Sequence, residues 1–172
     1  MLDGFAITHT IPDFQDRKPE IMRRIADMGT HSLIEETAKI TNTDWYIQEK
    51  LPRTYLDLIL PDLDVALQKL KDTVYYSLPP SAYTARLDTY WFQQYGPGDF
   101  HGWHIHNTLY AMVAFIELGD GAGTRFMVNG VERILPVQEG QIILFPGLVP
   151  HCSPPNNTGK RKTVVAANIS FF

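Results

Sequence analysis

Short β-rich segments separated by turn residues fill the second half of the chain, and they constrain its fold most strongly. They begin after residue 85, and no helical pattern lies between them. Val128-Asn129-Gly130-Val131 predicts a tight hairpin, because Asn-Gly accepts the positive φ angles of a type I′ turn. Closely spaced strands of this kind predict an antiparallel sandwich or barrel. The predicted strands are residues 87–95, 108–118, 123–128, 131–137, 141–145 and 162–172.

The first part of the chain follows a helical pattern instead. In residues 19–40 apolar side chains recur mostly at three- or four-residue spacing between charges, and Gly29-Thr30 predicts a break into two helices. A further helix is predicted over residues 60–78. Pro61 suits its first turn, and Pro79-Pro80 would end it.

Length and composition favour one globular domain with a sizeable core. The chain has 172 residues, of which 44% are hydrophobic and 20% are charged. We therefore expect a single α+β domain over residues 1–172. Residues 1–80 would form a helical cap, packed on a β-barrel that residues 81–172 form.

Charge and cysteine content bear on partners and compartment. The net charge of -4 gives no basic footprint for a nucleic acid, although Lys160-Arg161-Lys162 is a local basic run. The single cysteine, Cys152, excludes an intrachain disulfide and favours a reducing compartment. With no secretory signal and no apolar run of about 18 residues, we expect a cytoplasmic protein that does not enter a membrane. The apolar C-terminus, ISFF, is a candidate for burial in a homodimer interface.

Three of the six histidines lie in the segment YGPGDFHGWHIHN, residues 95–107. In an extended strand His104 and His106 point to one face, about 6–7 Å apart, and together they can bind one metal ion. His151, which follows the predicted strand QIILF, is the best candidate for a third ligand. Strict alternation places His101 on the opposite face from His104, so we expect it at the rim of the site.

These segments resemble the Fe(II)/2-oxoglutarate oxygenases. YGPGDFHGWHIH is similar to the prolyl-4-hydroxylase pattern, in which a tyrosine precedes an H-x-D motif. FPGLVPHCSPPNNTGKRKT resembles the far end of that site, with a distal histidine and a basic residue about ten positions later. The run WFQQY, GDFH and WHIH is also similar to uncharacterised oxygenase-like proteins of phage genomes. The resemblance covers residues 87–172 and implies the double-stranded β-helix, a jelly roll that the cupins share.

The resemblance implies a metal centre with one departure from the family. His104 and His151 match the first and the distal ligand, and the metal would be Fe(II) with 2-oxoglutarate as cosubstrate. His106 stands where the family has an aspartate. A carboxylate ligand would leave the metal site at a net charge of +1, whereas three neutral imidazoles leave it at +2. Asp99 is a weaker candidate for a carboxylate ligand, because it lies outside the H-x-H frame.

The far carboxylate of 2-oxoglutarate needs a buried cation with a hydroxyl beside it. Arg161-Lys162-Thr163 resembles the R-x-S/T element of some family members, in which Arg161 would bind the carboxylate with help from Thr163. Lys162 is the rival, because the prolyl-hydroxylase relatives use a lysine. Three further residues are candidates for the lining of the cosubstrate pocket: Tyr95, Tyr110 and Asn168.

The implied activity is an oxygenase that hydroxylates a substrate C–H bond and releases succinate and CO2. Two alternatives stay open at this point. One is a cupin-type three-histidine metalloprotein, either a dioxygenase that needs no 2-oxoglutarate or an isomerase, and the other is a non-catalytic barrel that binds a metal or ligand. A basic side chain at 161 or 162 that points into the barrel would favour the oxygenase. The substrate, a small molecule or a side chain, has no signature in the sequence.

Overall fold

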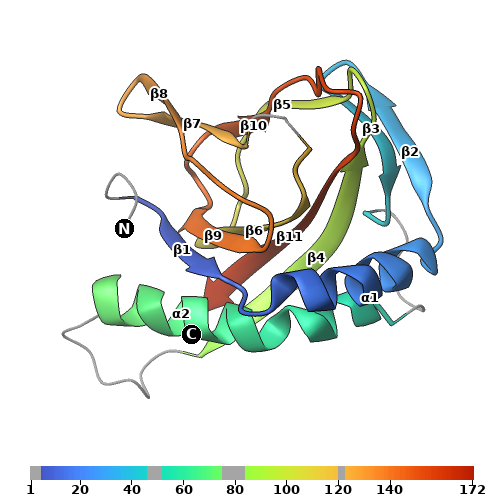
Figure 1. The fold of residues 1–172 in the computed structure, drawn as a ribbon. Helices are drawn as coiled ribbons and strands as arrows, with labels where there is room; N and C mark the ends of the chain where they lie inside the picture. Colours follow the sequence, from blue (N-terminus) through green and yellow to red (C-terminus); the bar gives the residue numbers. More distant parts are fainter. Residues whose placement is uncertain (1–4, 46–51, 75–83, 120–122) are drawn as a thin grey trace.

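A computed structural model describes residues 5–45, 52–74, 84–119 and 123–172. Two helices lie against the outer face of a strongly curled antiparallel sheet (Figure 1). The predicted α+β architecture, with N-terminal helices packed on a C-terminal double-stranded β-helix, is confirmed. The helical elements are α1 (Phe14–Ala26), the short 3-10 helix η1 (Thr54–Leu58) and α2 (Leu60–Val74).

The strands of the described residues form one sheet whose order differs from the order in the chain. From one edge to the other the order is β1-β9-β6-β11-β4-β3-β5-β10-β7-β8, and β2 adds to β3. The long strands β4 and β11 run through the middle of Figure 1, and the sheet curls until β5 and β10 lie across from them. The bounds are β1 (Ile7–Thr10), β2 (His31–Glu35), β3 (Ala38–Thr43), β4 (Ala85–Tyr95), β5 (Phe100–His104), β6 (Tyr110–Glu117), β7 (Arg125–Val128), β8 (Val131–Ile134), β9 (Gln141–Pro146), β10 (His151–Ser153) and β11 (Lys162–Phe171).

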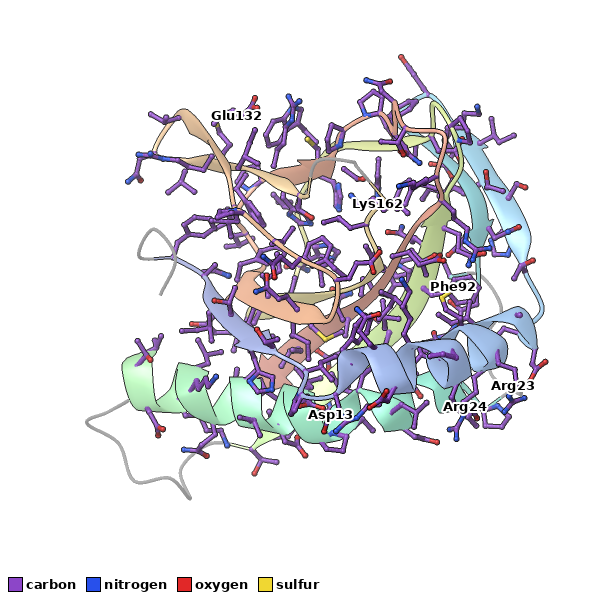
Figure 2. All side chains as sticks on the ribbon, in the orientation of Figure 1. Asp13, Arg23, Arg24, Phe92, Glu132 and Lys162 are labelled. Carbon is purple, nitrogen blue, oxygen red and sulfur yellow. The ribbon has the colours of Figure 1, made fainter. Side chains whose placement is uncertain are left out.

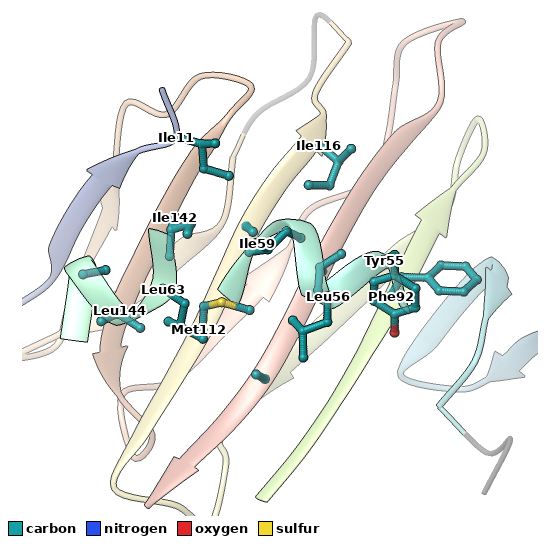
Figure 3. Packing of buried hydrophobic residues seen from close by; sticks show 14 of the residues in the cluster. Ile11, Tyr55, Leu56, Ile59, Leu63, Phe92, Met112, Ile116, Ile142 and Leu144 are labelled. Carbon is teal, nitrogen blue, oxygen red and sulfur yellow. The ribbon is translucent and has the colours of Figure 1, made fainter. Parts of the chain in front are cut away.

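Successive residues of the central strands supply two separate cores, because side chains alternate between the faces of a sheet. On the outer face, η1 and α2 pack against β4, β6 and β9, as Figure 3 shows for Leu56, Ile59 and Leu63 opposite Met112 and Ile142. On the inner face a second cluster fills part of the curl; it includes Val113, Phe115, Phe126, Phe145 and Val164. The helices thus cover one face of the sheet, and the other face is left to form an interior site.

The prediction of a second helix within residues 19–40 is wrong. Residues 31–43 form the hairpin β2–β3, in which Leu33 pairs with Ile40. The segment with helix-like spacing of apolar residues is short here, and the same spacing is compatible with a hairpin. Tertiary pairing decides, because β3 pairs with both β4 and β5 and buries Ala38 and Ile40. Ile34, on the other face of β2, is 75% exposed.

Residues 7–10, expected in the helical cap, form the edge strand β1, and β8 ends at Ile134 and not at residue 137. Several other local predictions are confirmed. The predicted helix before Gly29 is α1, which begins at Phe14, and Pro61 lies in the first turn of α2. Asn129 and Gly130 have φ angles of 51° and 74°, as the predicted β7–β8 hairpin requires. Pro79-Pro80 and most of the glycine loop after β6 lie outside the described residues. Among the helices described, none has the length and apolar character to cross a membrane.

Candidate metal centre

Two neighbouring strands bring the predicted ligands together. His104, the last residue of β5, is paired directly with His151, the first residue of β10. His106 follows two residues after β5, and its backbone N–H donates a hydrogen bond to the carbonyl of Gly147 at 2.9 Å. Ring nitrogens of these three histidines all lie within 4.8 Å of one another. Residues 45 positions apart in the sequence therefore share one site, as the sequence predicted.

Backbone carbonyls orient two of the three imidazoles. His104 Nδ1 lies 2.8 Å from the carbonyl of Gly102, and His151 Nδ1 lies 3.0 Å from that of Val149. Because a carbonyl only accepts hydrogen bonds, each Nδ1 carries the hydrogen, and each Nε2 keeps its lone pair for a metal.

The third imidazole completes a donor set that fits a divalent cation. His106 Nε2 lies 3.1 Å from His151 Nε2. Two nitrogens bound at about 2.1 Å to one ion and at a right angle would be about 3.0 Å apart. These residues can therefore hold a metal in adjacent positions and leave other positions open. A triad of two histidines and one aspartate does not form here, because position 106 is a histidine and not an aspartate.

The environment keeps the imidazoles neutral. Burial, together with the charge of the neighbouring His104, lowers the pKa of His151 to about 3 and the pKa of His106 to about 4. Burial also lowers the pKa of His104. Neutral imidazole is the form that binds a metal, so no proton competes for these nitrogens near pH 7.

His101 belongs to this cluster, contrary to the prediction that it faces away from His104. The two rings stack with their centroids 3.9 Å apart and an angle of 14° between the planes. The β5–β10 register shifts between His151 and Ser153, which breaks the strict alternation. Gly102, between the two histidines, packs against the backbone of Thr37, where a Cβ would lie 2.9 Å from the carbonyl oxygen.

We expect the stacked ring of His101 to hold His104 in its ligating orientation. His101→Ala should weaken metal binding about fivefold, because an aromatic pair of this kind contributes about 1 kcal/mol. His101→Phe keeps a ring at this position and should retain most of the affinity. Competition with a chelating dye measures both variants against the unchanged protein. Equal losses in the two variants would contradict a stacking role.

An inner pocket adjoins the cluster inside the curl of the sheet, where residues of β4, β6 and β11 and of β5 and β10 line it. Lys162 is paired with Tyr95, and its buried amine lies within the curl of the sheet (Figure 2). The amine donates a hydrogen bond to Ser153 Oγ at 2.9 Å, and it lies 5.4 Å from the centre of the Tyr95 ring. Burial lowers the pKa of Lys162 to about 8. The pocket lining contains this lysine and the histidines but no aspartate or glutamate.

Arg161 and Thr163 lie outside this pocket. Arg161 forms an ion pair with Glu117, with Nε to Oε2 and Nη2 to Oε1 distances of 2.7 and 3.0 Å, and half of its side chain is exposed. The Thr163 hydroxyl also donates to the Glu117 carboxylate. The strand period of two explains this outcome, because residues 161 and 163 point away from the face that residue 162 occupies. The structure brings Lys162, and not the predicted pair of Arg161 and Thr163, to the histidines.

The three other predicted pocket residues have different places. Tyr95 is buried in the inner pocket, and its hydroxyl donates to Gln93 Oε1 at 2.8 Å. Tyr110 packs instead against Phe171 in the core under the helices, because it shares the outer face of β6 with Met112. Asn168 lines an outer cleft beside the histidines, and its amide donates to Thr89 Oγ1 at 2.8 Å.

Asp99 does not belong to the cluster either. Its carboxylate accepts hydrogen bonds from the Gly96 N–H at 2.9 Å and the Thr41 hydroxyl at 2.5 Å, and it pairs with Lys39 at 3.3 Å. It therefore stabilises the turn between β4 and β5.

Sequence reasoning missed three polar residues of the inner pocket, Gln93, Thr124 and Ser153. Gln93 and Ser153 each lie two positions from a residue that was predicted, Tyr95 and His151. The period of two along a strand was therefore a usable signal for both.

The outer cleft has a volume of about 350 Å³ and reaches the histidines from the side of the β2–β3 hairpin. Trp45 and Trp91 form one wall, with ring centroids 4.1 Å apart in an edge-to-face arrangement. Trp91 in turn lies 5.9 Å from the ring of His106. The histidine cluster therefore separates a narrow inner pocket from a wider cleft that is open to solvent.

Comparison with known proteins identifies the fold. No protein-family model and no curated protein matches the chain. Among solved structures, a Pseudomonas putida prolyl-4-hydroxylase matches with a TM-score of 0.69 at 18% identity, covering 98% of this chain and 94% of that one. A 2OG-Fe(II) oxygenase family oxidoreductase from Burkholderia pseudomallei matches with a TM-score of 0.68 at 14% identity, covering 95% and 85%.

A third match extends the same result. The viral collagen prolyl hydroxylase of Paramecium bursaria Chlorella virus-1, solved as a 2-oxoglutarate complex, has a TM-score of 0.63 at 12% identity, covering 95% of both chains. At these identities the likeness is one of fold. The chain has the double-stranded β-helix of the 2-oxoglutarate and Fe(II) oxygenases, and within that fold it carries a three-histidine cluster. The similarity to phage proteins stays a prediction.

Proposed function

We propose that this protein is a non-heme Fe(II)- and 2-oxoglutarate-dependent oxygenase. The observation that carries the proposal is the buried amine of Lys162 on the same inner face as the three histidines. In the fold of 2-oxoglutarate-dependent enzymes, the far carboxylate of the cosubstrate is the natural anion for this amine.

The charges of the site favour a dianionic cosubstrate. Three neutral imidazoles would leave a divalent metal at +2, and the Lys162 amine adds one more positive charge. The 2-oxoglutarate dianion would bring two negative charges to this site. The pocket volume of about 40 Å³ has room for about three waters.

His104, His106 and His151 would hold the metal in this proposal. Bound Fe(II) would supply the activation of O2 that hydroxylates a C–H bond while 2-oxoglutarate is converted to succinate and CO2. Lys162 binds the far carboxylate of the cosubstrate, and Ser153 fixes the direction of the amine.

The side chains around the amine keep the pocket suited to a carboxylate. Burial raises the pKa of Tyr95, so its hydroxyl stays protonated and neutral, and it donates its hydrogen to Gln93 Oε1. Val164 and Ala166 line the pocket with apolar surface and limit the entry of water.

The histidine at position 106, in place of the usual carboxylate ligand, is the observation that supports a second candidate function. A three-histidine site is also compatible with a cupin-type dioxygenase that needs no 2-oxoglutarate, or with an isomerase. The two candidates differ in their use of the inner pocket. In the second candidate the Lys162 amine has no cosubstrate to bind.

Anaerobic titration separates these candidates. Protein loaded with Fe(II) is titrated with 2-oxoglutarate while the weak visible charge-transfer band of a bidentate 2-oxo acid on Fe(II) is recorded. We expect a saturable band that is lost in His104→Ala. Metal bound through the histidines without a band at any 2-oxoglutarate concentration would overturn the oxygenase and favour the cupin-type candidate.

A further inference from the structure

The three histidines of the metal centre differ in how their rings are held. Backbone carbonyls accept hydrogen bonds from Nδ1 of His104 and of His151. Among the described residues, no backbone carbonyl or carboxylate does the same for His106, whose Nε2 faces His151. A histidine that binds a metal through Nε2 carries its hydrogen on Nδ1, and this N–H almost always donates to an acceptor. His106 therefore needs a supporting contact that the backbone does not give it.

Asn168 presents a side-chain amide to this ring. It lies six residues after Lys162 on the same face of β11, and it lines the outer cleft together with His106. The side chains of Asn168 and His106 interact. The register of β11 with β4 shifts directly after Asn168, and such irregularities often redirect a side chain beside an active site. The strand thus places one polar side chain against the ligand that lacks an acceptor.

The amide of Asn168 has a fixed direction and an unused acceptor. Its Nδ2 donates to Thr89 Oγ1 at 2.8 Å, and Thr89 is the residue paired with Asn168 across the two strands. The amide oxygen, Oδ1, is buried and makes no hydrogen bond of normal geometry with the described residues. Leaving a buried carbonyl oxygen without a donor is destabilising, so a small movement that brings a donor to it is favoured.

We propose that Asn168 is a positioning residue of the metal centre: its Oδ1 accepts the Nδ1 hydrogen of His106 and holds that ring with Nε2 toward the metal. An aspartate ligand at position 106 has no ring N–H, so the histidine at this position creates the need for the acceptor. The assignment rests on the metal-binding part of the proposed function and is independent of the cosubstrate.

Trp91 is the rival donor for the same oxygen. Its Nε1 is also buried without a hydrogen-bond partner in the described part of the chain, and it lines the same cleft. Because Trp91 is paired with Ala166, it is a diagonal neighbour of Asn168 on the inner face. We favour His106, because its ring interacts with Asn168 and because both other ligands have an acceptor of this kind.

NMR spectroscopy of 15N-labelled protein loaded with Zn²⁺ separates the two donors. Zn²⁺ is diamagnetic, and imidazole nitrogens bind it well. We expect a slowly exchanging Nδ1–H signal for each of the three histidines. Asn168→Leu, which has a similar shape and no acceptor, should remove the His106 signal and leave those of His104 and His151. An unchanged His106 signal, its absence from the unchanged protein, or a change in the Trp91 indole signal alone overturns the proposal.

The Zn²⁺ affinity of the same variants tests the consequence. By competition with a chelating dye, Asn168→Leu should bind Zn²⁺ about tenfold more weakly, the lower end for a contact that supports a ligating histidine. Asn168→Asp keeps an acceptor at this position, and the Thr89 hydroxyl can donate to its second oxygen, so the affinity should be restored. Equal losses in the two variants overturn the acceptor role.

Two further variants complete the design. Ser170→Ala is the matched control on the same strand, because the Ser170 hydroxyl donates to Asp88 and lines neither pocket. It should leave the affinity and the His106 signal unchanged, and a loss equal to that of Asn168→Leu overturns the assignment. Thr89→Val releases the amide without removing its oxygen. It should speed the exchange of the His106 N–H, which keeps the proposal testable if Asn168→Leu does not fold.

The outcomes also separate this proposal from the proposed function, because none of these measurements uses 2-oxoglutarate. A missing charge-transfer band with an intact dependence on Asn168 overturns the oxygenase alone. A saturable band in a protein whose His106 signal and metal affinity ignore Asn168 overturns the positioning role alone.

Discussion

Lys162→Met is expected to weaken 2-oxoglutarate binding about 100-fold while the metal stays bound. The substitution keeps an unbranched side chain in the pocket and removes the charge that binds the far carboxylate. A charge-assisted hydrogen bond in a buried site contributes about 1.5–3 kcal/mol, which corresponds to this loss. The dissociation constant is read from the charge-transfer titration, and the metal content is measured separately.

The neighbouring residue provides a matched control. Arg161→Met removes an equal charge one position away, but Arg161 pairs with Glu117 outside the pocket. We therefore expect an unchanged dissociation constant for 2-oxoglutarate. The opposite pattern, with the loss in Arg161→Met and none in Lys162→Met, would contradict the assignment of the anchor to Lys162.

The same anchor gives 2-oxoglutarate binding a defined dependence on pH. The pKa of Lys162 is lowered by burial from 10.5 to about 8 in the free protein. Only the protonated amine attracts the carboxylate, and the bound carboxylate raises the pKa again. Above pH 8 the dissociation constant should therefore rise by about tenfold for each pH unit, until the pKa of the complex is reached.

The histidines set the lower limit of the working range. The pKa values of His151 and His106, about 3 and about 4, leave both imidazoles neutral at pH 5. Between pH 5 and pH 8 the protein thus has metal-binding imidazoles and a charged anchor together. In Lys162→Met the dependence above pH 8 should disappear. If that variant keeps the slope, another group causes it.

Local rules predicted the core of the site because its strands are regular. His104, His106 and His151 followed from the period of two and from a short H-x-H spacing, and the structure brings all three together. The same period of two determines which of the neighbouring residues 161, 162 and 163 faces the pocket, which the sequence alone could not determine. Residues 161, 162 and 163 differ only in the face they occupy, and that face depends on the register of β11 with β4. Register is a property of the assembled sheet and not of the segment.

The failures have the same physical origin. The hairpin β2–β3 has apolar spacing that also fits a helix, and its pairing with β4 and β5 is visible only in the fold. The stacking of His101 on His104 depends on an irregularity between β5 and β10. Both errors concern the outer cleft, to which the hairpin contributes Leu33 and Glu35. The sequence therefore predicted the three clustered histidines and gave no account of the outer cleft.

His106→Ala is expected to reduce Fe(II) affinity by at least about 100-fold, because it removes one of three protein ligands whose supporting contacts alone are worth 10- to 100-fold. His104→Ala and His151→Ala should have the same effect. Equilibrium dialysis against Fe(II) under anaerobic conditions measures the affinity and the stoichiometry. His31→Gln is the control, since His31 lies at the start of β2 and lines neither pocket.

His106→Asp should keep metal binding and lower the affinity for 2-oxoglutarate. The carboxylate again provides a third ligand, so one Fe(II) per chain is expected. The net charge of the metal site falls from +2 to +1, and the attraction for the 2-oxoglutarate dianion falls with it. We therefore expect a higher dissociation constant for 2-oxoglutarate than in the unchanged protein. Full metal binding by His106→Ala would show that His106 is not a ligand, and the three-imidazole charge could then no longer explain the choice of a dianionic cosubstrate.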